Sequence, residues 1–262
     1  MSETPGQEYG DQVRRITSEF RADTVEVHPD TEALVAAAAT RFVEVVTAAQ
    51  AARGSASVVL TGGGTGIGLL ELVRESPGDI DWSALDIFWG DERFVPAGDP
   101  ERNELQARRA LLDHVPVDPA RVRAVATSDG EYPDPTVAAA QYSAAVHAHL
   151  ATAGVFDLHL LGMGGEGHVN SLFPDTDAVR EAHELVVAIT DSPKPPPVRV
   201  TLTIPAIRRT RHVVLVVGGA AKADAVAAAL GGAAAVDIPA AGAVGTESTT
   251  WLLDEPAASA LK

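Results

Sequence analysis

The feature of this sequence that most restricts its fold is a repeated passage from a short apolar run, through a glycine-rich or charged loop, toward a helical pattern. The loops of this kind are residues 61–66, 90–96, 162–168 and 218–222. Strands that alternate with helices pair in parallel, because each helix returns the chain to the same end of the sheet. We therefore predict an α/β protein: a single domain of three layers, Rossmann-like, with a mainly parallel sheet and helices on both faces.

The individual elements are predicted from hydrophobic spacing, with short apolar runs as strands and patterns of period near 3.6 as helices. The expected strands are 24–27, 57–60, 85–89, 122–126, 156–161, 199–204, 212–217 and 249–253, and the expected helices are 31–52, 67–74, 103–112, 136–150 and 222–230. The alternation in 199–204 differs from that of a fully buried parallel strand, so this strand is expected at a sheet edge.

The domain organisation is expected to be simple. Residues 1–20 are polar and have no clear period, and we predict a mobile leader there. Residues 21–262 are predicted to form one domain, since a chain of 262 residues can bury a large core. In an open parallel sheet the ligand site lies beyond the carboxyl ends of the strands, so the four loops are expected to meet at one site.

Composition excludes several classes of function. A formal net charge of −16 disfavours binding to nucleic acid or to an anionic membrane. No apolar stretch approaches the roughly 20 residues that span a bilayer, and the N-terminus has no hydrophobic signal core, so a cytoplasmic location is expected. The absence of cysteine excludes disulfides, thiolate catalysis and zinc sites built from cysteine.

The first loop has the character of an anion cradle. Gly62, Gly63, Gly64 and Thr65 carry little side-chain bulk and precede a helix, whose N-terminal amides and dipole favour negative charge. The spacing fits neither a P-loop nor the G-x-G-x-x-G register of dinucleotide-binding proteins. The loop is therefore interpreted as a phosphate site, with a tight strand-to-helix turn as the alternative.

Three consecutive charges, Asp91, Glu92 and Arg93, follow the expected strand 85–89. Such a cluster is compatible with a solvated loop. The functional alternative is that one carboxylate orients a partner while Arg93 binds an anion or a developing oxyanion.

His168 is the candidate general base. It follows several glycines directly after an apolar strand, and Glu166 stands two residues before it, where a carboxylate can orient the imidazole. A neutral imidazole at this place can take a proton from a water that attacks an ester carbonyl. Lys222, at the start of a helix after two glycines, is a further candidate for anion binding.

Taken together, these loops resemble the glucosamine-6-phosphate isomerase and 6-phosphogluconolactonase superfamily over roughly residues 25–253. Residues 162–174 read GMGGEGHVNSLFP and are similar to the family signature G-x-G-x-D-G-H-x-x-S-L-F-P. Residues 91–96 with Asn103 resemble the lactonase motif D-E-R-x-V-P…N, and Lys194-Pro195-Pro196, residues 199–203 and Gly218 to Ala223 complete the pattern.

Two departures from the family pattern stand out. Glu166 replaces the usual aspartate, and Gly64-Thr65-Gly66 stand where the family often has Ser-Thr-Pro, so amide contacts to phosphate are expected to matter more than hydroxyl contacts.

The resemblance implies hydrolysis of 6-phospho-D-glucono-1,5-lactone to 6-phosphogluconate, in the pentose phosphate pathway, without a cofactor or metal. His168 would then be the general base, and Arg93 would stabilise the oxyanion or anchor the sugar hydroxyls. Asp91 and Glu166 would be the other catalytic residues. The phosphate would be held by the amides of residues 62–65, by Lys222 and by Arg199. The expected partner is the small phosphorylated lactone alone, for a monomer or homodimer.

Two alternatives remain open at this level. An amino-sugar phosphate isomerase and deaminase would use Asp91 as a base on carbon, but Arg93 and the Ser-Leu-Phe-Pro ending favour the lactonase branch. A non-catalytic sugar-phosphate sensor would keep the phosphate loop and would not need His168. A dinucleotide-binding oxidoreductase is disfavoured, because no acidic residue ends a strand at the expected distance of roughly 20 residues.

Overall fold

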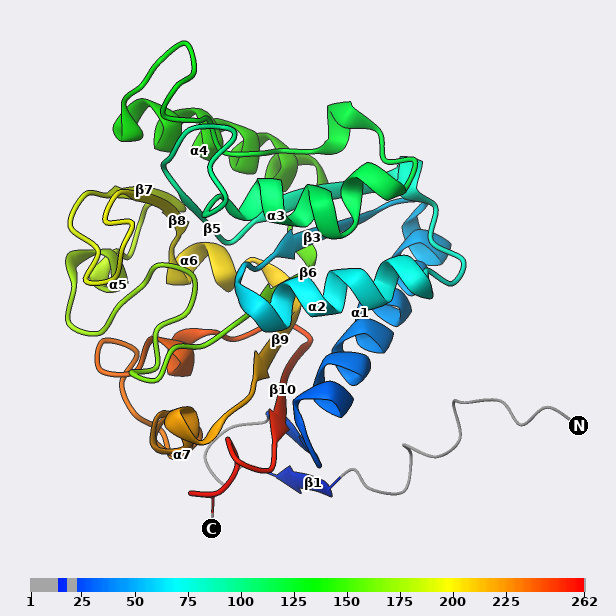
Figure 1. Ribbon diagram of the computed structural model, residues 1–262, viewed down its shortest axis with the longest axis vertical. Coiled ribbons are helices and arrows are strands. Elements are labelled where there is room, and N and C mark those ends of the chain that lie inside the picture. Colours follow the sequence, from blue (N-terminus) through cyan, green and yellow to red (C-terminus); the bar gives the residue numbers. More distant parts are fainter. Residues whose placement is uncertain (1–13, 18–22, 262) are drawn as a thin grey trace, which may run out of the picture.

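The computed structural model describes residues 14–17 and 23–261, and within them a seven-stranded sheet forms the centre of the molecule (Figure 1). Its strand order is β1-β2-β10-β9-β6-β3-β4, and every neighbouring pair is parallel except β1 with β2. The strands are β1 (Arg14–Thr17), β2 (Thr24–His28), β3 (Ala56–Leu60), β4 (Leu85–Trp89), β6 (Phe156–Leu161), β9 (Thr210–Val217) and β10 (Ser248–Asp254). The predicted mainly parallel sheet is thus confirmed.

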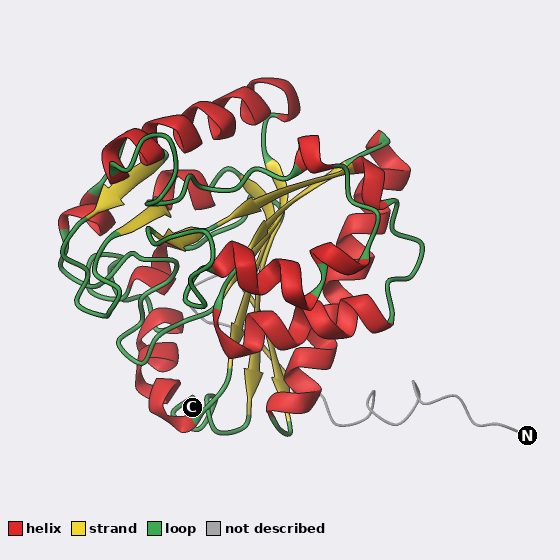
Figure 2. Ribbon diagram, turned by 45° about the horizontal axis from the view of Figure 1, so that its top comes forward, coloured by secondary structure: helices red, strands yellow, loops and turns green. Residues whose placement is uncertain are grey.

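Helices cover both faces of this sheet, as Figure 2 shows. They are α1 (Thr31–Arg53), α2 (Gly63–Glu75), α3 (Asn103–Ala110), α4 (Pro135–Ala153), α5 (Asp177–Arg180), α6 (Ile204–Ile207) and α7 (Ala223–Leu230). The buried apolar side chains of α1, α2 and α3 pack on one face, and those of α4, α6 and α7 pack on the other. The three-layer α/β architecture follows from this arrangement.

Helix α1 illustrates how local signals in the sequence set the element boundaries. Asp30 caps its N-terminus, because the carboxylate accepts a hydrogen bond from the amide of Ala33. Gly54 ends the helix in the left-handed conformation with φ 77°, and its N–H donates to the carbonyl of Gln50. Between them the spacing of Leu34 and Phe42 turns one face of the helix toward the sheet.

A second, antiparallel sheet corrects the expectation for residues 199–204. Strand β8 (Arg199–Leu202) does not lie at the edge of the main sheet; it is the central strand of a separate sheet with order β5-β8-β7, whose other members are β5 (Asp91–Arg93) and β7 (Val186–Ile189). All four residues of β8 are buried, since both neighbours and the main body of the protein cover it. This small sheet brings Asp91 and Arg199 to the same place.

Other sequence-based boundaries also need correction. Residues 122–126 are not a strand: Val122 forms only an isolated bridge with Ile87. Helix α2 begins at Gly63, earlier than the expected residue 67, so the glycine loop itself supplies the first helical turn. Strand β1 falls inside the segment 1–20 that was expected to be a leader, and the rest of that segment lies outside the described residues.

The described part of the chain contains no helix that is both long enough and apolar enough to cross a membrane.

Candidate active site

The four loops predicted to converge do so at a single pocket of about 210 Å³ beyond the carboxyl ends of β3, β4, β6 and β9. The residues that line it are Thr61, Gly62, Gly63, Gly64, Thr65, Asp91, Arg93, Asn103, Gly162, Met163, Gly164, His168, Asn170, Arg199 and Lys222. Of the predicted site residues, only Glu166 is absent from this lining, and it lies directly behind His168.

A larger hollow of about 640 Å³ lies beside this pocket and shares neither its glycine loop nor its cations. Its titratable side chains are the carboxylates of Asp175, Asp177, Glu181 and Asp191. A phosphorylated substrate would be repelled there, so the smaller pocket is the better candidate for an anion.

The glycine loop presents an open helix N-terminus to the pocket. No side chain in the described residues caps α2 at Gly62, and its first turn contains no acidic residue. The backbone at Gly63 has φ 83°, in the left-handed region that favours glycine. The first amides of α2 are therefore not capped by a side chain of the described residues, and such a helix N-terminus favours an anion.

The two carboxylates of the charged cluster have different roles. Glu92 is fully buried and accepts hydrogen bonds from the amides of Asn103 (2.7 Å), Glu104 (2.8 Å) and Arg93 (2.8 Å), so it anchors the start of α3. Burial raises the pKa of Glu92 to about 7, against the opposing effect of Arg102. It points into the protein and not into the pocket.

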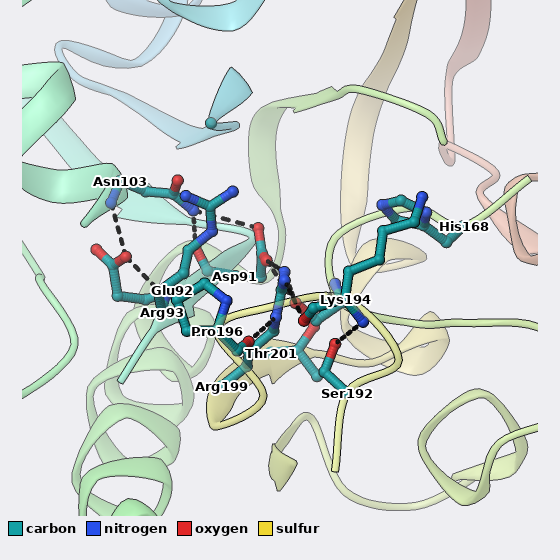
Figure 3. Close-up of polar contacts among 12 residues, drawn as sticks. Asp91, Glu92, Arg93, Asn103, His168, Ser192, Lys194, Pro196, Arg199 and Thr201 are labelled. Carbon is teal, nitrogen blue, oxygen red and sulfur yellow. Dashed lines mark hydrogen bonds and ion pairs between the residues drawn. The ribbon is translucent and has the colours of Figure 1, made fainter. Parts of the chain in front are cut away.

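Asp91 is the carboxylate that faces the pocket (Figure 3). It accepts a hydrogen bond of 2.5 Å from the hydroxyl of Ser171, and its Oδ2 atom lies 3.7 Å from Nη1 of Arg199. The side-chain amide of Asn103 donates to the Asp91 carbonyl at 2.9 Å. Three separate segments of the chain therefore fix this carboxylate.

Arg93 lines the pocket. Its Nη1 atom donates to the carbonyl of Glu101 at 2.6 Å, while Nε has no hydrogen-bond partner among the described residues. Nη1 also lies 3.6 Å from the carboxylate of Glu101, and the unpaired Nε is buried. A guanidinium that lines an anion pocket suits the oxyanion role expected of it.

His168 lies in a loop shaped by two glycines. A Cβ atom on Gly164 would be 2.0 Å from Nδ1 of His168, so only glycine leaves room for the ring, and Gly167 adopts φ 88°. The imidazole stacks on Phe173 with ring centroids 4.4 Å apart, and its side chain is 19% exposed. The loop thus presents one face of the ring to the pocket.

The electrostatics of His168 suit a base. Burial lowers its pKa, although the neighbouring Glu166 raises it and Lys194 lowers it further. The Oε1 atom of Glu166 lies 3.1 Å from Nδ1, an ion-pair distance, although the two atoms are not aligned as a hydrogen bond. A carboxylate at this position favours the proton on Nδ1, which leaves Nε2 as the basic atom of a neutral ring.

Arg199 and Lys222 are two further cations of the pocket lining. Arg199 donates to the carbonyls of Lys194, Pro195 and Pro196 and to the hydroxyl of Ser171. Most of its N–H groups are therefore already paired. Lys222 lines the pocket at the end of a short 3-10 turn, Ala220–Lys222, and burial lowers its pKa.

Sequence reasoning did not assign individual roles to Thr61, Asn170, Ser171 and Lys194. Ser171 and Lys194 belong to the motifs quoted above, but their contacts with Asp91 and Glu166 join segments far apart in the chain. The left-handed conformation of Asn170 (φ 50°) is a backbone property that no spacing pattern reveals.

The histidines His114, His147, His149 and His159 do not line the pocket. Among the described residues, no group of three or more histidine or carboxylate side chains could hold a metal ion.

Comparison with known proteins agrees with this geometry. Residues 29–251 match the family described as glucosamine-6-phosphate isomerases/6-phosphogluconolactonase. A protein of Mycobacterium tuberculosis named 6-phosphogluconolactonase is 54% identical over 244 residues, which cover 92% of this chain and 99% of the relative. A protein of Streptomyces coelicolor with the same name is 54% identical, covering 90% of this chain and 93% of the relative.

Among solved structures, 6-phosphogluconolactonase from Trypanosoma cruzi superposes with a TM-score of 0.80 at 27% identity. The match covers 95% of this chain and 99% of the other.

Proposed function

The chain belongs to the glucosamine-6-phosphate isomerase and 6-phosphogluconolactonase family, and we propose that it hydrolyses 6-phospho-D-glucono-1,5-lactone to 6-phosphogluconate, a step of the pentose phosphate pathway. The observation that carries the proposal is the imidazole of His168, whose pKa is lowered by burial, in the same pocket as an open helix N-terminus and the cations Arg93 and Lys222. The relatives at 54% identity bear the name of this activity.

In the reaction, Nε2 of His168 takes a proton from a water molecule while the water oxygen attacks the lactone carbonyl carbon. Arg93 stabilises the negative charge that develops on the carbonyl oxygen. The tetrahedral intermediate then collapses, the bond to the ring oxygen breaks, and that oxygen takes the proton from the imidazolium. The product is the open-chain acid, and His168 is neutral again.

The remaining residues of the site position the substrate. The phosphate lies on the first amides of α2 with Lys222 beside it, which fixes the far end of the substrate. General-base assistance contributes about 10² to 10⁴ in rate, and a reactive lactone requires no stronger catalysis. We assign Arg199 to the support of Asp91 and Ser171 and give it a minor part, through Nη1, in substrate binding, because its other donors are occupied.

The deaminase alternative is less well supported. It needs Asp91 to accept a proton from carbon, yet this carboxylate already accepts from Ser171 and lies beside Arg199. We also propose that residues 21–262 form one domain and that the protein acts in the cytoplasm as a monomer or homodimer, on the lactone alone.

The test is the rate of loss of the lactone, generated in situ and corrected for spontaneous hydrolysis. We expect acceleration by the wild type, loss of nearly all of it in His168→Ala, and full activity in His147→Ala, whose imidazole is exposed on α4 and contacts Ser143. Affinity for 6-phosphogluconate should survive in His168→Ala. No acceleration by the wild type would exclude the lactonase, and retained activity in His168→Ala would exclude the proposed base.

A further inference from the structure

A lysine outside the pocket lining is connected to the proposed base through one carboxylate. The Nζ atom of Lys194 lies 2.7 Å from Oε1 and 2.9 Å from Oε2 of Glu166, and Oε1 is the atom that lies 3.1 Å from Nδ1 of His168. In Figure 3 the Lys194 side chain runs toward His168 from a loop on the other side of the site. A single oxygen is therefore shared between the ammonium and the imidazole.

The same aromatic ring supports both partners. His168 stacks on Phe173, and Nζ of Lys194 lies 5.9 Å from the centroid of that ring. An ammonium near the face of an aromatic ring is attracted by its quadrupole. Phe173 thus restricts the positions of the base and of the cation that holds its carboxylate partner.

The backbone of Lys194 is fixed by Arg199. The guanidinium donates to the carbonyl of Lys194 at 3.0 Å and to those of Pro195 and Pro196 at 3.1 and 3.0 Å. Its Nη1 atom also donates to Ser171, which binds Asp91. The backbone of Lys194, from which its side chain extends, is therefore held in place relative to Asp91, which lines the pocket.

The ion pair between Lys194 and Glu166 adds little to the stability of the fold. The side chains of Lys194 and Glu166 are 49% and 34% exposed, and an exposed pair of this kind contributes little to stability. Its significance lies in where it places the carboxylate.

We propose that Lys194 is a positioning residue for the general base: it holds the Glu166 carboxylate, as an anion, against Nδ1 of His168 and so keeps Nε2 as the basic atom. This inference rests on the proposed function, because it concerns the same histidine. Without the ammonium, Glu166 can rotate into solvent, and the imidazole loses the partner that selects its tautomer.

The charges around His168 give the pair a recognisable pH signature. Glu166 and, across the pocket, Asp91 raise the pKa of His168, whereas Lys194 lowers it. Arg93, Arg199 and Lys222 are the other charged groups that line the pocket. Glu166 affects this pKa more than Lys194 does. If the carboxylate leaves Nδ1 when the ammonium is removed, both effects are lost, the pKa of His168 falls, and the acid limb of the rate profile should move to lower pH while kcat decreases.

The first experiment compares Lys194→Met and Lys194→Arg with a matched control, Arg180→Met, which removes an exposed cation of α5 that contacts Asp175. We expect Lys194→Met to lower kcat more than it raises KM and to move the acid limb of kcat/KM to lower pH. Lys194→Arg should keep the wild-type profile. A Lys194→Met profile that coincides with that of Arg180→Met would overturn the inference.

A second measurement determines the tautomer of the His168 imidazole and does not depend on enzymatic activity. Nitrogen NMR of the folded protein distinguishes the two imidazole tautomers, with the His168 signals assigned by their loss in His168→Ala. We expect the Nδ1–H form in the wild type and a mixture of tautomers in Lys194→Met. An unchanged tautomer would overturn the role of Lys194, whereas an inactive wild type with this tautomer change would reject the proposed function and leave the positioning intact.

The pathway through Glu166 is tested by a double-mutant cycle. If Lys194 acts through the carboxylate, Lys194→Met should change kcat much less when Glu166→Gln is already present. Fully additive effects on log kcat would mean that Lys194 acts on the reaction by another route, which would overturn the proposal.

Discussion

The side-chain oxygen of Asn103 occupies the space that a Cβ atom on Gly62 would need, since the two would be only 2.1 Å apart. Asn103 cannot easily retreat, because its amide donates to Glu92 and its side-chain amide donates to Asp91. The start of α3 is thus packed directly against the glycine loop, which couples this loop to Asp91, the residue whose carboxylate faces the pocket.

The substitution Gly62→Ala should therefore disturb the site without imposing backbone strain, since Gly62 has φ −84° and ψ −168°, which alanine can adopt. We expect a loss of about 1–3 kcal/mol in stability from overpacking and a clear rise in KM for the lactone. Gly68→Ala is the control, because the nearest atom to its Cβ would be Val35 Cγ1 at an ordinary 3.5 Å. Equal KM values for the two variants would refute the coupling.

Glu92 is predicted to be a stability residue. In Glu92→Ala the amides of Asn103 and Glu104 lose their acceptor in a buried place, and Arg102 loses a carboxylate 4.0 Å away. We expect a loss of about 3–5 kcal/mol, measured by urea denaturation. The control Glu32→Ala, an exposed carboxylate in the first turn of α1, should cost less than about 1 kcal/mol. A Glu92→Ala protein as stable as this control would contradict the assignment.

Much of the architecture was predictable because parallel strands must end at one edge of the sheet. The four loops could therefore be assigned to one pocket, and the residues that mark them, such as Gly62, His168 and Lys222, were found from their place after apolar runs. The expected helix 31–52 agrees closely with α1, because its ends at Asp30 and Gly54 depend on capping preferences, which are local.

The second sheet could not be predicted on the same basis. Strand β5 has only three residues, too few for any periodicity, and it follows β4 after the single residue Gly90. The short apolar run 122–126 resembles a strand, but it leaves the sheet after one bridge between Val122 and Ile87. The link from Lys194 to Glu166 spans 28 positions, so it depends on tertiary structure alone.

The pH dependence of activity should reflect the lowered pKa of His168. A general base acts when deprotonated, and burial lowers the pKa of this imidazole. The acid limb of kcat/KM should therefore have its midpoint below the ordinary histidine value of about 6.5. The measurement is lactone loss from about pH 5 to about pH 7.5, corrected for spontaneous hydrolysis at each point. A midpoint at or above the ordinary value would show that burial does not control this group.

His159 should make the folded state sensitive to acid. It is fully buried on β6, and burial lowers its pKa to about 3, whereas in the unfolded chain it titrates near 6.5. Between these values the unfolded chain binds more protons, so stability is complete above about pH 6.5 and falls as the pH decreases, by up to about 1.4 kcal/mol per pH unit.

The variant His159→Gln should flatten this dependence, whatever its effect on stability at neutral pH. Urea denaturation at several pH values measures the slope, and His147→Gln, on the exposed face of α4, is the control that should leave it unchanged. Glu92 contributes an opposite slope between about pH 4.5 and about pH 7, because burial raises its pKa, but this contribution is common to both proteins. An unaltered slope in His159→Gln would rule out the histidine as the source.

The guanidinium of Arg199 can have one of two roles in this pocket: it can support neighbouring site residues, or it can bind the substrate phosphate. If it supports the site, Arg199→Lys should lower kcat, because a lysine keeps the charge but cannot donate at once to the carbonyls of Lys194, Pro195 and Pro196. Affinity for 6-phosphogluconate, measured by calorimetry, should then stay within about threefold of the wild type, less than 1 kcal/mol. Lys222→Met is the comparison, and it should weaken that affinity by about tenfold or more, since it removes a charged contact to phosphate. If both variants lose affinity equally, Arg199 holds the phosphate itself, and the support of Asp91 must come from Ser171 and Asn103 alone.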